Sequence, residues 1–216
     1  MFHFVKILFL LFFMVLELHA KDYYTIDNAI LQKAQKEYGK EAKERLVALV
    51  KLLNELSPKS EQEKLEAIND FFNRVSFETD MQVWHKKDYW ATREEFLDKD
   101  AGDCEDYVIA KYFSLLQLRF SEESMFLTYV KAIKYRQSHM VLTYFPKKNA
   151  PPLVLDNIVH KILPSTERND LRPVFSFNGE KIFMAKQRGL GREIPRGKVN
   201  LQKWTNLILK IKREER

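Results

Sequence analysis

Apolar residues recur at helical spacing through the first half of the chain. This pattern predicts helices over residues 26–38, 41–56, 60 to about 75 and 105–116. Gly39 marks the end of the first helix, and the capping-box pair Ser60 and Glu63 opens the third. Asp103 precedes the fourth helix as a suitable N-cap. The N-terminal half is therefore expected to be mainly helical.

Shorter runs rich in β-branched and aromatic residues follow. They predict strands over residues 125–133, 139–145, 153–158, 174–177 and 181–184. Asn178 and Gly179 separate the last two strands and are typical of a tight hairpin turn. Helices followed by antiparallel strands indicate the α+β class. Residues 21–216 suffice for one domain with a sizeable core, and they contain no internal repeat, phosphate-binding glycine loop or paired-cysteine zinc motif.

The first 20 residues have the composition of an export signal. Lys6 precedes an apolar run over residues 7–16 that is too short for a comfortable membrane span, and a small-residue cleavage site follows at Ala20. We therefore predict a signal peptide over residues 1–20, with an uncleaved anchor as the alternative. Because this leader carries no cysteine, a lipoprotein is not expected.

The chain of 216 residues has a formal net charge of +6 and an isoelectric point near 9.2. Basic residues concentrate over residues 186–196 and 203–216. Nucleic-acid binding is a poor explanation in an exported protein, whereas a basic surface could meet an anionic membrane or an acidic partner protein. We favour a simpler interpretation, in which these segments form a solvated helix face and a frayed tail.

Candidate chemistry begins at Cys104, the only cysteine, which stands in the sequence Gly-Asp-Cys-Glu-Asp. A lone cysteine cannot form an intramolecular disulfide, and the start of a helix stabilises a thiolate through unpaired N–H groups and the helix dipole. Asp103, Glu105 and Asp106 oppose this effect, because neighbouring negative charge raises the pKa of a thiol. Two interpretations stay open: the acids bind a hard cation such as Ca²⁺, or they only cap the helix, which is worth about 0.3–1 kcal/mol each.

A nucleophilic cysteine needs a base, and the chain has five histidines. His3 and His19 lie in the leader, and His85 lies in a charged stretch typical of a solvated loop. His160 follows a predicted strand and is the weaker of the remaining two. His139 begins a predicted strand, which would hold it at a rigid edge, and it is therefore the preferred base.

Asp156 is the only acid in the predicted strand over residues 153–158. If this strand and the preceding one form a hairpin, Asp156 lies close enough to His139 to orient its ring. The sequence thus predicts Cys104 as nucleophile, His139 as base and Asp156 as orienting acid. The competing interpretation is a structural histidine at a strand edge, which is the commoner case.

A longer run around the cysteine resembles a known family. It comprises Asp88-Tyr89-Trp90-Ala91-Thr92, Glu95-Phe96-Leu97, Ala101-Gly102-Asp103-Cys104-Glu105-Asp106-Tyr107 and Ile109-Ala110-Lys111-Tyr112-Phe113. Over about residues 70–160 the chain is similar to the bacterial transglutaminase-like cysteine proteinases of the LapG type. Arg93 is a departure, because proline is expected after the Ala-Thr pair.

This resemblance implies a papain-like, transglutaminase-like fold, in which the nucleophile helix packs on an antiparallel sheet that carries the histidine and the aspartate. It implies a calcium-dependent periplasmic cysteine endopeptidase with Cys104, His139 and Asp156 as its triad. Asp103 and Glu105 match the acids that the family uses for calcium, with Asp106 as a further ligand.

The resemblance also implies a substrate and a regulator. Family members cleave the N-terminal region of a large, repeat-containing surface adhesin near a pair of alanines, which releases the adhesin and promotes biofilm dispersal. An inner-membrane cyclic-di-GMP receptor restrains them, because its periplasmic domain sequesters the protease.

Alternatives to the endopeptidase stay open at the level of sequence. A transglutaminase-like acyltransferase or amidase would use the same three residues, with an amine in place of water. A catalytically inactive, calcium-dependent binding module belongs to a different class. Trp84, Tyr89 and Trp90 precede the nucleophile helix and are expected in the wall of a substrate cleft, although aromatic residues are more often packed in a core.

Overall fold

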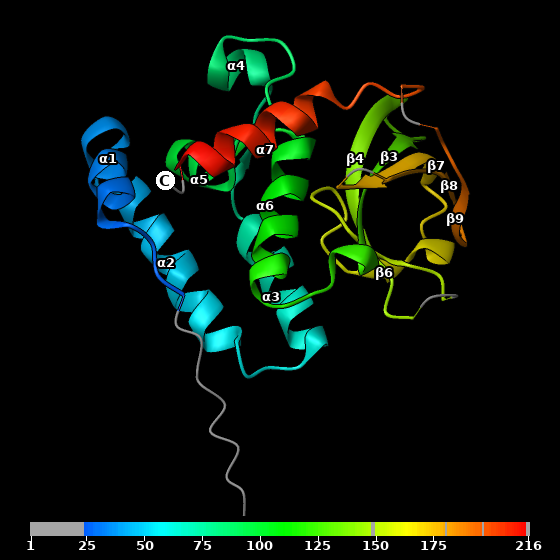
Figure 1. Ribbon diagram of the computed structural model, residues 1–216, viewed down its shortest axis with the longest axis horizontal. Helices are drawn as coiled ribbons and strands as arrows, with labels where there is room; N and C mark the ends of the chain where they lie inside the picture. The colour runs from blue at the N-terminus through cyan, green and yellow to red at the C-terminus, as the bar shows by residue number, and fades with distance from the viewer. Residues whose placement is uncertain (1–23, 148–149, 180, 196, 215–216) are drawn as a thin grey trace, which may run out of the picture.

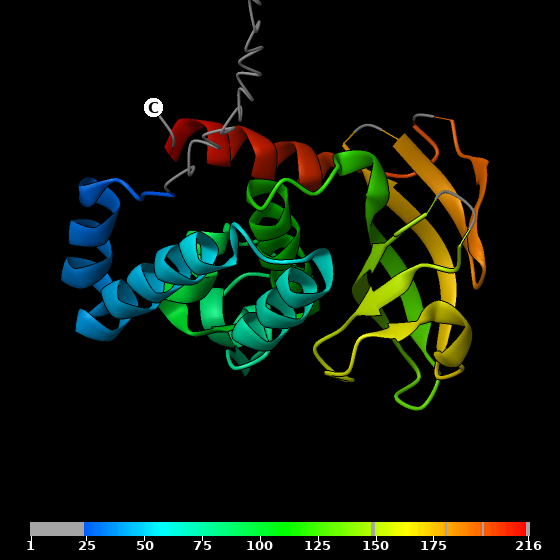
Figure 2. The same ribbon diagram turned by 90° about the horizontal axis from the view of Figure 1, so that it is seen from below.

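The computed structural model describes residues 24–147, 150–179, 181–195 and 197–214. The predicted signal peptide therefore lies outside the described residues. A helical part and a strongly curved sheet lie side by side, and helix α6 (Cys104–Gln117) runs between them (Figures 1 and 2). No helix of the described segments combines the length and the apolar character that crossing a membrane requires.

The predicted helices are confirmed, with changes at their ends. The helices of the structure are α1 (Asn28–Tyr38), α2 (Lys40–Leu56), α3 (Glu61–Phe72), α4 (Asp80–Trp84), α5 (Arg93–Lys99), α6 (Cys104–Gln117) and α7 (Gln202–Glu214). Asp27 sets the start of α1, because its side chain accepts a hydrogen bond from the Ala29 N–H. The capping box of Ser60 and Glu63 starts α3 as predicted. The sequence pattern does not predict α4 and α5, because five and seven residues are too few to show a helical period.

Within the described residues, seven strands form one antiparallel sheet in the order β6-β5-β4-β3-β7-β8-β9. They are β3 (Met125–Ala132), β4 (Gln137–Tyr144), β5 (Leu153–Leu155), β6 (Leu163–Pro164), β7 (Leu171–Asn178), β8 (Lys181–Lys186) and β9 (Gly189–Glu193). In the β3–β4 hairpin, Val130 lies opposite His139. Asn178 pairs with Lys181 across the predicted hairpin turn. A separate parallel pair, β1 (Ser76–Phe77) and β2 (Ala101–Gly102), leads into α6.

The predicted strand over residues 153–158 is too long. β5 ends at Leu155, and Asp156 is the first residue of the loop that follows. The Asp156 side chain accepts a hydrogen bond from the Ile158 N–H at 3.0 Å. This local bond turns the backbone out of the strand, although the apolar residues continue.

The main core joins buried residues of the helical part, of α6 and of the sheet, and Trp204 and Leu207 of α7 belong to it. Trp204 of α7 stacks on Phe113, with ring centroids 5.9 Å apart, and meets Phe177 edge-on at 5.6 Å. The prediction of a frayed tail is therefore wrong for the described part of this segment. Lys212 and Arg213, on the other side of α7, are exposed as expected for a solvated face.

Candidate active site

Cys104 is the first residue of α6, and the surrounding sequence explains its position. Asp103 is the N-cap, and it forms a capping box with Asp106, whose carboxylate accepts the Asp103 N–H at 3.3 Å. Glycine is needed at residue 102, because a Cβ atom there would lie 2.7 Å from the buried Phe96 ring and would also press on Asp106. The thiol is thus held where the chain passes tightly over the core and a helix begins.

His139 of β4 and Asp156 are in contact, as the hairpin argument predicts. His139 Nε2 lies 2.8 Å from Asp156 Oδ1, and both side chains are buried. Asp156 Oδ2 accepts a hydrogen bond from Arg168 Nη2 at 2.6 Å. Burial raises the pKa of Asp156, but the hydrogen bonds from His139, Ile158 and Arg168 outweigh it and hold the pKa well below its ordinary value. Asp156 is therefore an anion at neutral pH.

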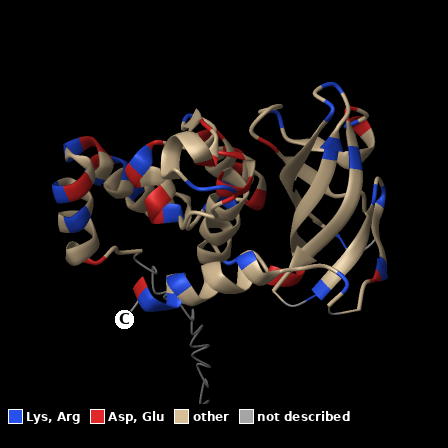
Figure 3. Ribbon diagram, turned by 90° about the horizontal axis from the view of Figure 1, so that it is seen from above, with Lys and Arg blue, Asp and Glu red and all other residues tan. Residues whose placement is uncertain are grey.

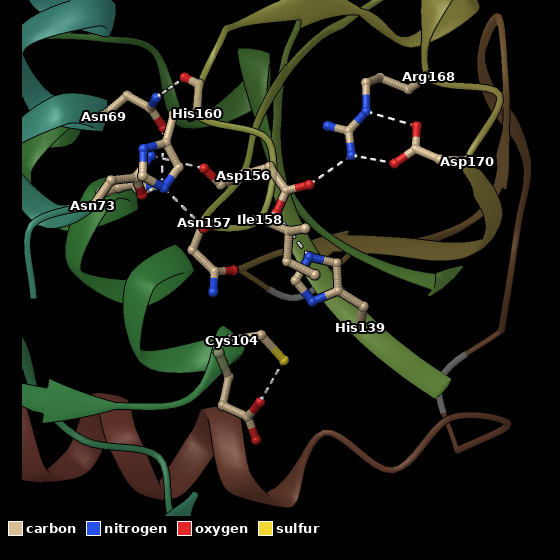
Figure 4. Close-up of polar contacts among 12 residues, drawn as sticks. Asn69, Asn73, Cys104, His139, Asp156, Asn157, Ile158, His160, Arg168 and Asp170 are labelled. Atoms are coloured by element: carbon tan, nitrogen blue, oxygen red, sulfur yellow. Dashed lines mark hydrogen bonds and ion pairs between the residues drawn. The ribbon is translucent and has the colours of Figure 1, made fainter. Parts of the chain in front are cut away.

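Cys104 approaches the imidazole from the side away from Asp156. Figure 4 shows the His139 ring between the Asp156 carboxylate and the Cys104 sulfur. The backbone N–H of Met140, the next residue of β4, hydrogen-bonds the sulfur. His160 is exposed, and its ring contacts a backbone carbonyl of its own loop at 3.2 Å. The structure thus brings the three predicted residues together and leaves the competing histidine outside.

The surroundings of Cys104 oppose ionisation of its thiol. Burial is the largest cause that raises the pKa of Cys104, and the negative charge of Glu105 is the next. The thiol donates a hydrogen bond to Glu105 Oε2, with the two atoms 3.1 Å apart. In this arrangement the thiol keeps its proton unless positive charge reaches the site.

Three carboxylates meet beside this thiol, and Figure 3 shows acidic residues gathered where the helical part faces the sheet. One oxygen each of Asp80, Asp103 and Asp106 lies within 4.8 Å of the others. Asp80 Oδ1 and Asp103 Oδ1 are buried and have no hydrogen-bond partner. Burial, together with the negative charge of Glu105, raises the pKa of Asp103 to about 10 and that of Asp106 well above its ordinary value. Unpaired buried oxygens of this kind fit a hard cation, because Ca²⁺ prefers oxygen ligands and would neutralise the acids.

The acids around the site do not all have the same task. Asp106 accepts backbone N–H groups on both oxygens, one of them from Ala91 at 2.9 Å, and so ties α6 to the segment that leads into α5. Glu105 forms a second candidate cation group with Asp80 and Asp88. In the structure Asp88 is paired with Lys203 of α7.

Comparison with known proteins agrees with this geometry. The bacterial transglutaminase-like cysteine proteinase family (BTLCP) matches over residues 35–170. The chain belongs to this family. Two solved structures of LapG from Legionella pneumophila are each 35% identical to it. The EGTA-treated form has a TM-score of 0.73 and covers 85% of this chain and 96% of its own, and the calcium-bound form has a TM-score of 0.72 and covers 86% and 99%. A search of curated proteins found no match.

In this cysteine proteinase the three aromatic residues that we predicted in the wall of a substrate cleft do not share one environment. Trp90 is buried and stacks on Phe177 with ring centroids 6.2 Å apart, so it lies in the core. Trp84 and Tyr89 are half-buried and pack on each other at 4.7 Å. Of the three residues, only Trp84 and Tyr89 therefore have side-chain surface exposed to solvent.

Arg93, the departure from the expected family pattern, is the first residue of α5. Proline is favoured at such a position because the N–H there has no partner within the helix. Arg93 instead uses its side chain, which pairs with Glu94 at 2.7 Å and donates to Gln117 Oε1 at 2.6 Å. Arg93 therefore contacts α6 at its C-terminal end, more than three helical turns from the Cys104 thiol.

Sequence reasoning misses Asp80, Asp88 and Arg168. Asp80 follows Thr79 in a capping-box sequence, which signals the start of a helix and not a ligand. Arg168 bridges Asp156 to Asp170, with its Nε and Nη2 atoms 2.9 and 2.7 Å from the Asp170 oxygens. No spacing relative to the cysteine marks these residues, because tertiary packing alone brings them to the site.

Proposed function

We propose that this protein is a calcium-dependent cysteine endopeptidase in which Cys104 is the nucleophile, His139 the general base and Asp156 the acid that orients the base. The observation that carries the proposal is the buried 2.8 Å contact between His139 and Asp156, with the sulfur on the other side of the ring. Membership of a cysteine proteinase family supports the same assignment.

In this mechanism the two ring nitrogens of His139 have different tasks. Nε2 is held by Asp156, which fixes the tautomer and stabilises the imidazolium. Nδ1 takes the proton of Cys104 as the sulfur attacks a peptide carbonyl, and it then returns a proton to the leaving amine. Water hydrolyses the acyl-enzyme. The backbone N–H of Cys104, at the start of α6, meets the oxyanion.

We further assign a calcium site to Asp80, Asp103 and Asp106, with Glu105 beside it. The buried, unpaired oxygens of Asp80 and Asp103 support this assignment. LapG of Legionella pneumophila has been solved in a calcium-bound form. A divalent cation here supplies the positive charge that lowers the pKa of the neighbouring thiol.

As substrate we propose the N-terminal region of a large, repeat-containing surface adhesin, cleaved near a pair of alanines so that the adhesin is released and the biofilm disperses. As regulator we propose an inner-membrane cyclic-di-GMP receptor whose periplasmic domain sequesters the protease. Residues 1–20 would direct the chain to the periplasm. The support for these proposals is the likeness to the LapG type and the composition of the leader.

The test is cleavage of the N-terminal region of an adhesin from the same genome by purified residues 21–216, with Ca²⁺ and with a chelator. Cys104→Ala is the matched control, because it keeps the fold and the acids but removes the nucleophile. The proposal is supported if cleavage is lost on chelation and is also lost in Cys104→Ala. Cleavage that persists under chelation contradicts the proposed calcium dependence. Cleavage by Cys104→Ala refutes the assignment of Cys104 as nucleophile. Product analysis with an added amine detects acyl transfer.

A further inference from the structure

Lys111 is a buried charge that the proposed mechanism does not use. It lies on α6, seven residues after Cys104, and its side chain is fully buried. Seven residues make almost two helical turns, so the two side chains leave α6 on the same side. Burial lowers the pKa of Lys111 to about 7. A buried ammonium is unfavourable unless its hydrogen bonds are satisfied, and those bonds indicate its task.

The Lys111 ammonium holds two asparagine side chains of α3. Nζ donates to Asn69 Oδ1 at 2.8 Å and to Asn73 Oδ1 at 2.7 Å. Because both amide oxygens are bound to the lysine, both amide nitrogens are left to donate elsewhere. Asn73 Nδ2 donates to the backbone carbonyl of Asp156 at 2.9 Å (Figure 4). Asn69 Nδ2 donates to the backbone carbonyl of His160 at 2.6 Å.

The segment that these amides reach has few other supports. β5 ends at Leu155 and β6 begins at Leu163, so the loop between them has no ladder of backbone hydrogen bonds. Asn73 hydrogen-bonds the backbone of this loop at its first residue, Asp156, and Asn69 does so at residue 160. Its conformation fixes where the Asp156 carboxylate points.

We propose that Lys111 is a positioning residue for the active-site acid: through Asn69 and Asn73 it holds the loop 156–160 and thereby the direction in which Asp156 meets His139. The proposal rests on the proposed roles of the cysteine, the histidine and the aspartate. It gives α6 two tasks, because the helix carries the nucleophile at its start and the support of the acid two turns later.

The chemistry of lysine explains why this residue type serves here. An asparagine amide can turn over and exchange its oxygen for its nitrogen. A turned amide would point its oxygen at the loop carbonyls, and two acceptors repel each other. Lys111 offers an N–H donor to each amide oxygen, so it fixes both amides in the orientation that the loop needs. Methionine would fill a similar volume without fixing either amide.

Other groups around Lys111 are consistent with an indirect action on Asp156. The charged and titratable groups that face it are the carboxylates of Asp70 and Asp156 and the ring of Tyr107, whose centroid lies 5.8 Å from Nζ. The Asp156 oxygens are occupied by other donors. Lys111 therefore reaches Asp156 through Asn73 and the backbone.

The test measures the rate at which iodoacetamide alkylates Cys104 as a function of pH, with calcium present, in the wild-type protein, Lys111→Met and Asn73→Ala. This readout needs no substrate. A well-oriented His139 makes the thiol reactive at neutral pH, where an ordinary thiol is protonated. We expect both variants to react about ten- to a hundredfold more slowly at neutral pH and like the wild type at strongly alkaline pH. Peptide cleavage should show a similar loss in kcat with little change in KM.

Lys64→Met is the matched control. Lys64 also links α3 to the C-terminal end of α6, but its hydrogen bond goes to the Leu118 carbonyl, at 3.5 Å, and not to the loop 156–160. A melting temperature for each variant separates unfolding from loss of orientation. A wild-type pH profile in Lys111→Met, or an equal shift in Lys64→Met, overturns the proposal.

If Lys111→Met does not fold, Asn73→Ala decides the question, and a wild-type profile in that variant overturns the proposal. An ordinary thiol profile in the wild-type protein has a different meaning. It contradicts the proposed function itself, because the cysteine is then not activated by the histidine.

Discussion

Replacing Arg168 with methionine tests how Asp156 is kept charged inside the protein. Arg168 Nη2 lies 2.6 Å from Asp156 Oδ2, and the side chains are 2% and 0% exposed. Methionine leaves Oδ2 without this donor, while Oδ1 keeps its bonds to His139 and Ile158. Removing one partner of a buried ion pair costs about 3–5 kcal/mol, and we expect the free energy of unfolding to fall by this amount at pH 7.

The pH dependence of this loss follows from the pKa of Asp156. Burial raises that pKa, but the hydrogen bonds to His139, Ile158 and Arg168 hold it below its value in the unfolded chain. A lowered carboxyl pKa stabilises the fold above the unfolded pKa, about 4, and this stability is lost as the pH falls through the folded pKa. In Arg168→Met the pKa of Asp156 rises. The deficit of the variant should therefore shrink as the pH falls into the range where its Asp156 is protonated.

Urea denaturation followed by circular dichroism, at pH 7 and at successively lower pH, measures this difference. Asp170→Asn is the matched control, because it removes the other carboxylate on Arg168, which is 42% exposed. Because Asp170 is partly solvated and asparagine keeps a side-chain oxygen that can accept from Arg168, this control should lose less stability than Arg168→Met. A deficit of Arg168→Met below about 1 kcal/mol at pH 7, or one that does not change with pH, would refute the reasoning.

Three further outcomes are expected. Gly102→Ala should lower the free energy of unfolding by about 1–3 kcal/mol, because the added Cβ meets the Phe96 ring at 2.7 Å; an unchanged melting temperature would contradict this. Calcium affinity should increase with pH, because Asp103, whose pKa is about 10 without metal, must lose its proton to bind; calorimetric titration should show the dependence weakened in Asp103→Asn. Between pH 7 and pH 10 the wild-type protein should gain stability relative to Lys111→Met. The pKa of Lys111, about 7 in the folded protein, lies below its value in the unfolded chain, so in this range mainly the unfolded chain holds the proton. Urea denaturation across this range measures the difference.

Elements with a regular period could be predicted closely from the sequence. α2, α6 and β3 begin and end within one residue of their predicted limits, because their buried faces repeat at helical or strand spacing. α7 is the counterexample. Its many lysines and arginines suggest a solvated tail, yet Trp204 and Leu207 are enough to anchor it in the core.

The residues of the candidate site likewise fall into those that the sequence predicts and those that it does not. Cys104, His139 and Asp156 could be found from the sequence, because a helix start and a hairpin are local structures whose residues can be placed by counting. Asp80 and Arg168 could not, since Asp80 lies on a short helix and Arg168 in the irregular segment between β6 and β7, and no local pattern shows where either segment packs.

Cys104 is the only cysteine of the chain, and this has a consequence for oxidation of its thiol. A sulfenic acid formed on this sulfur finds no second cysteine in the chain with which to close a disulfide. Its repair depends on thiols of other molecules, and without them oxidation continues to the sulfinic acid, which is not reversed by ordinary thiols. Peroxide should therefore inactivate this protein lastingly wherever small thiols are scarce, so its working lifetime is set by the reductants around it.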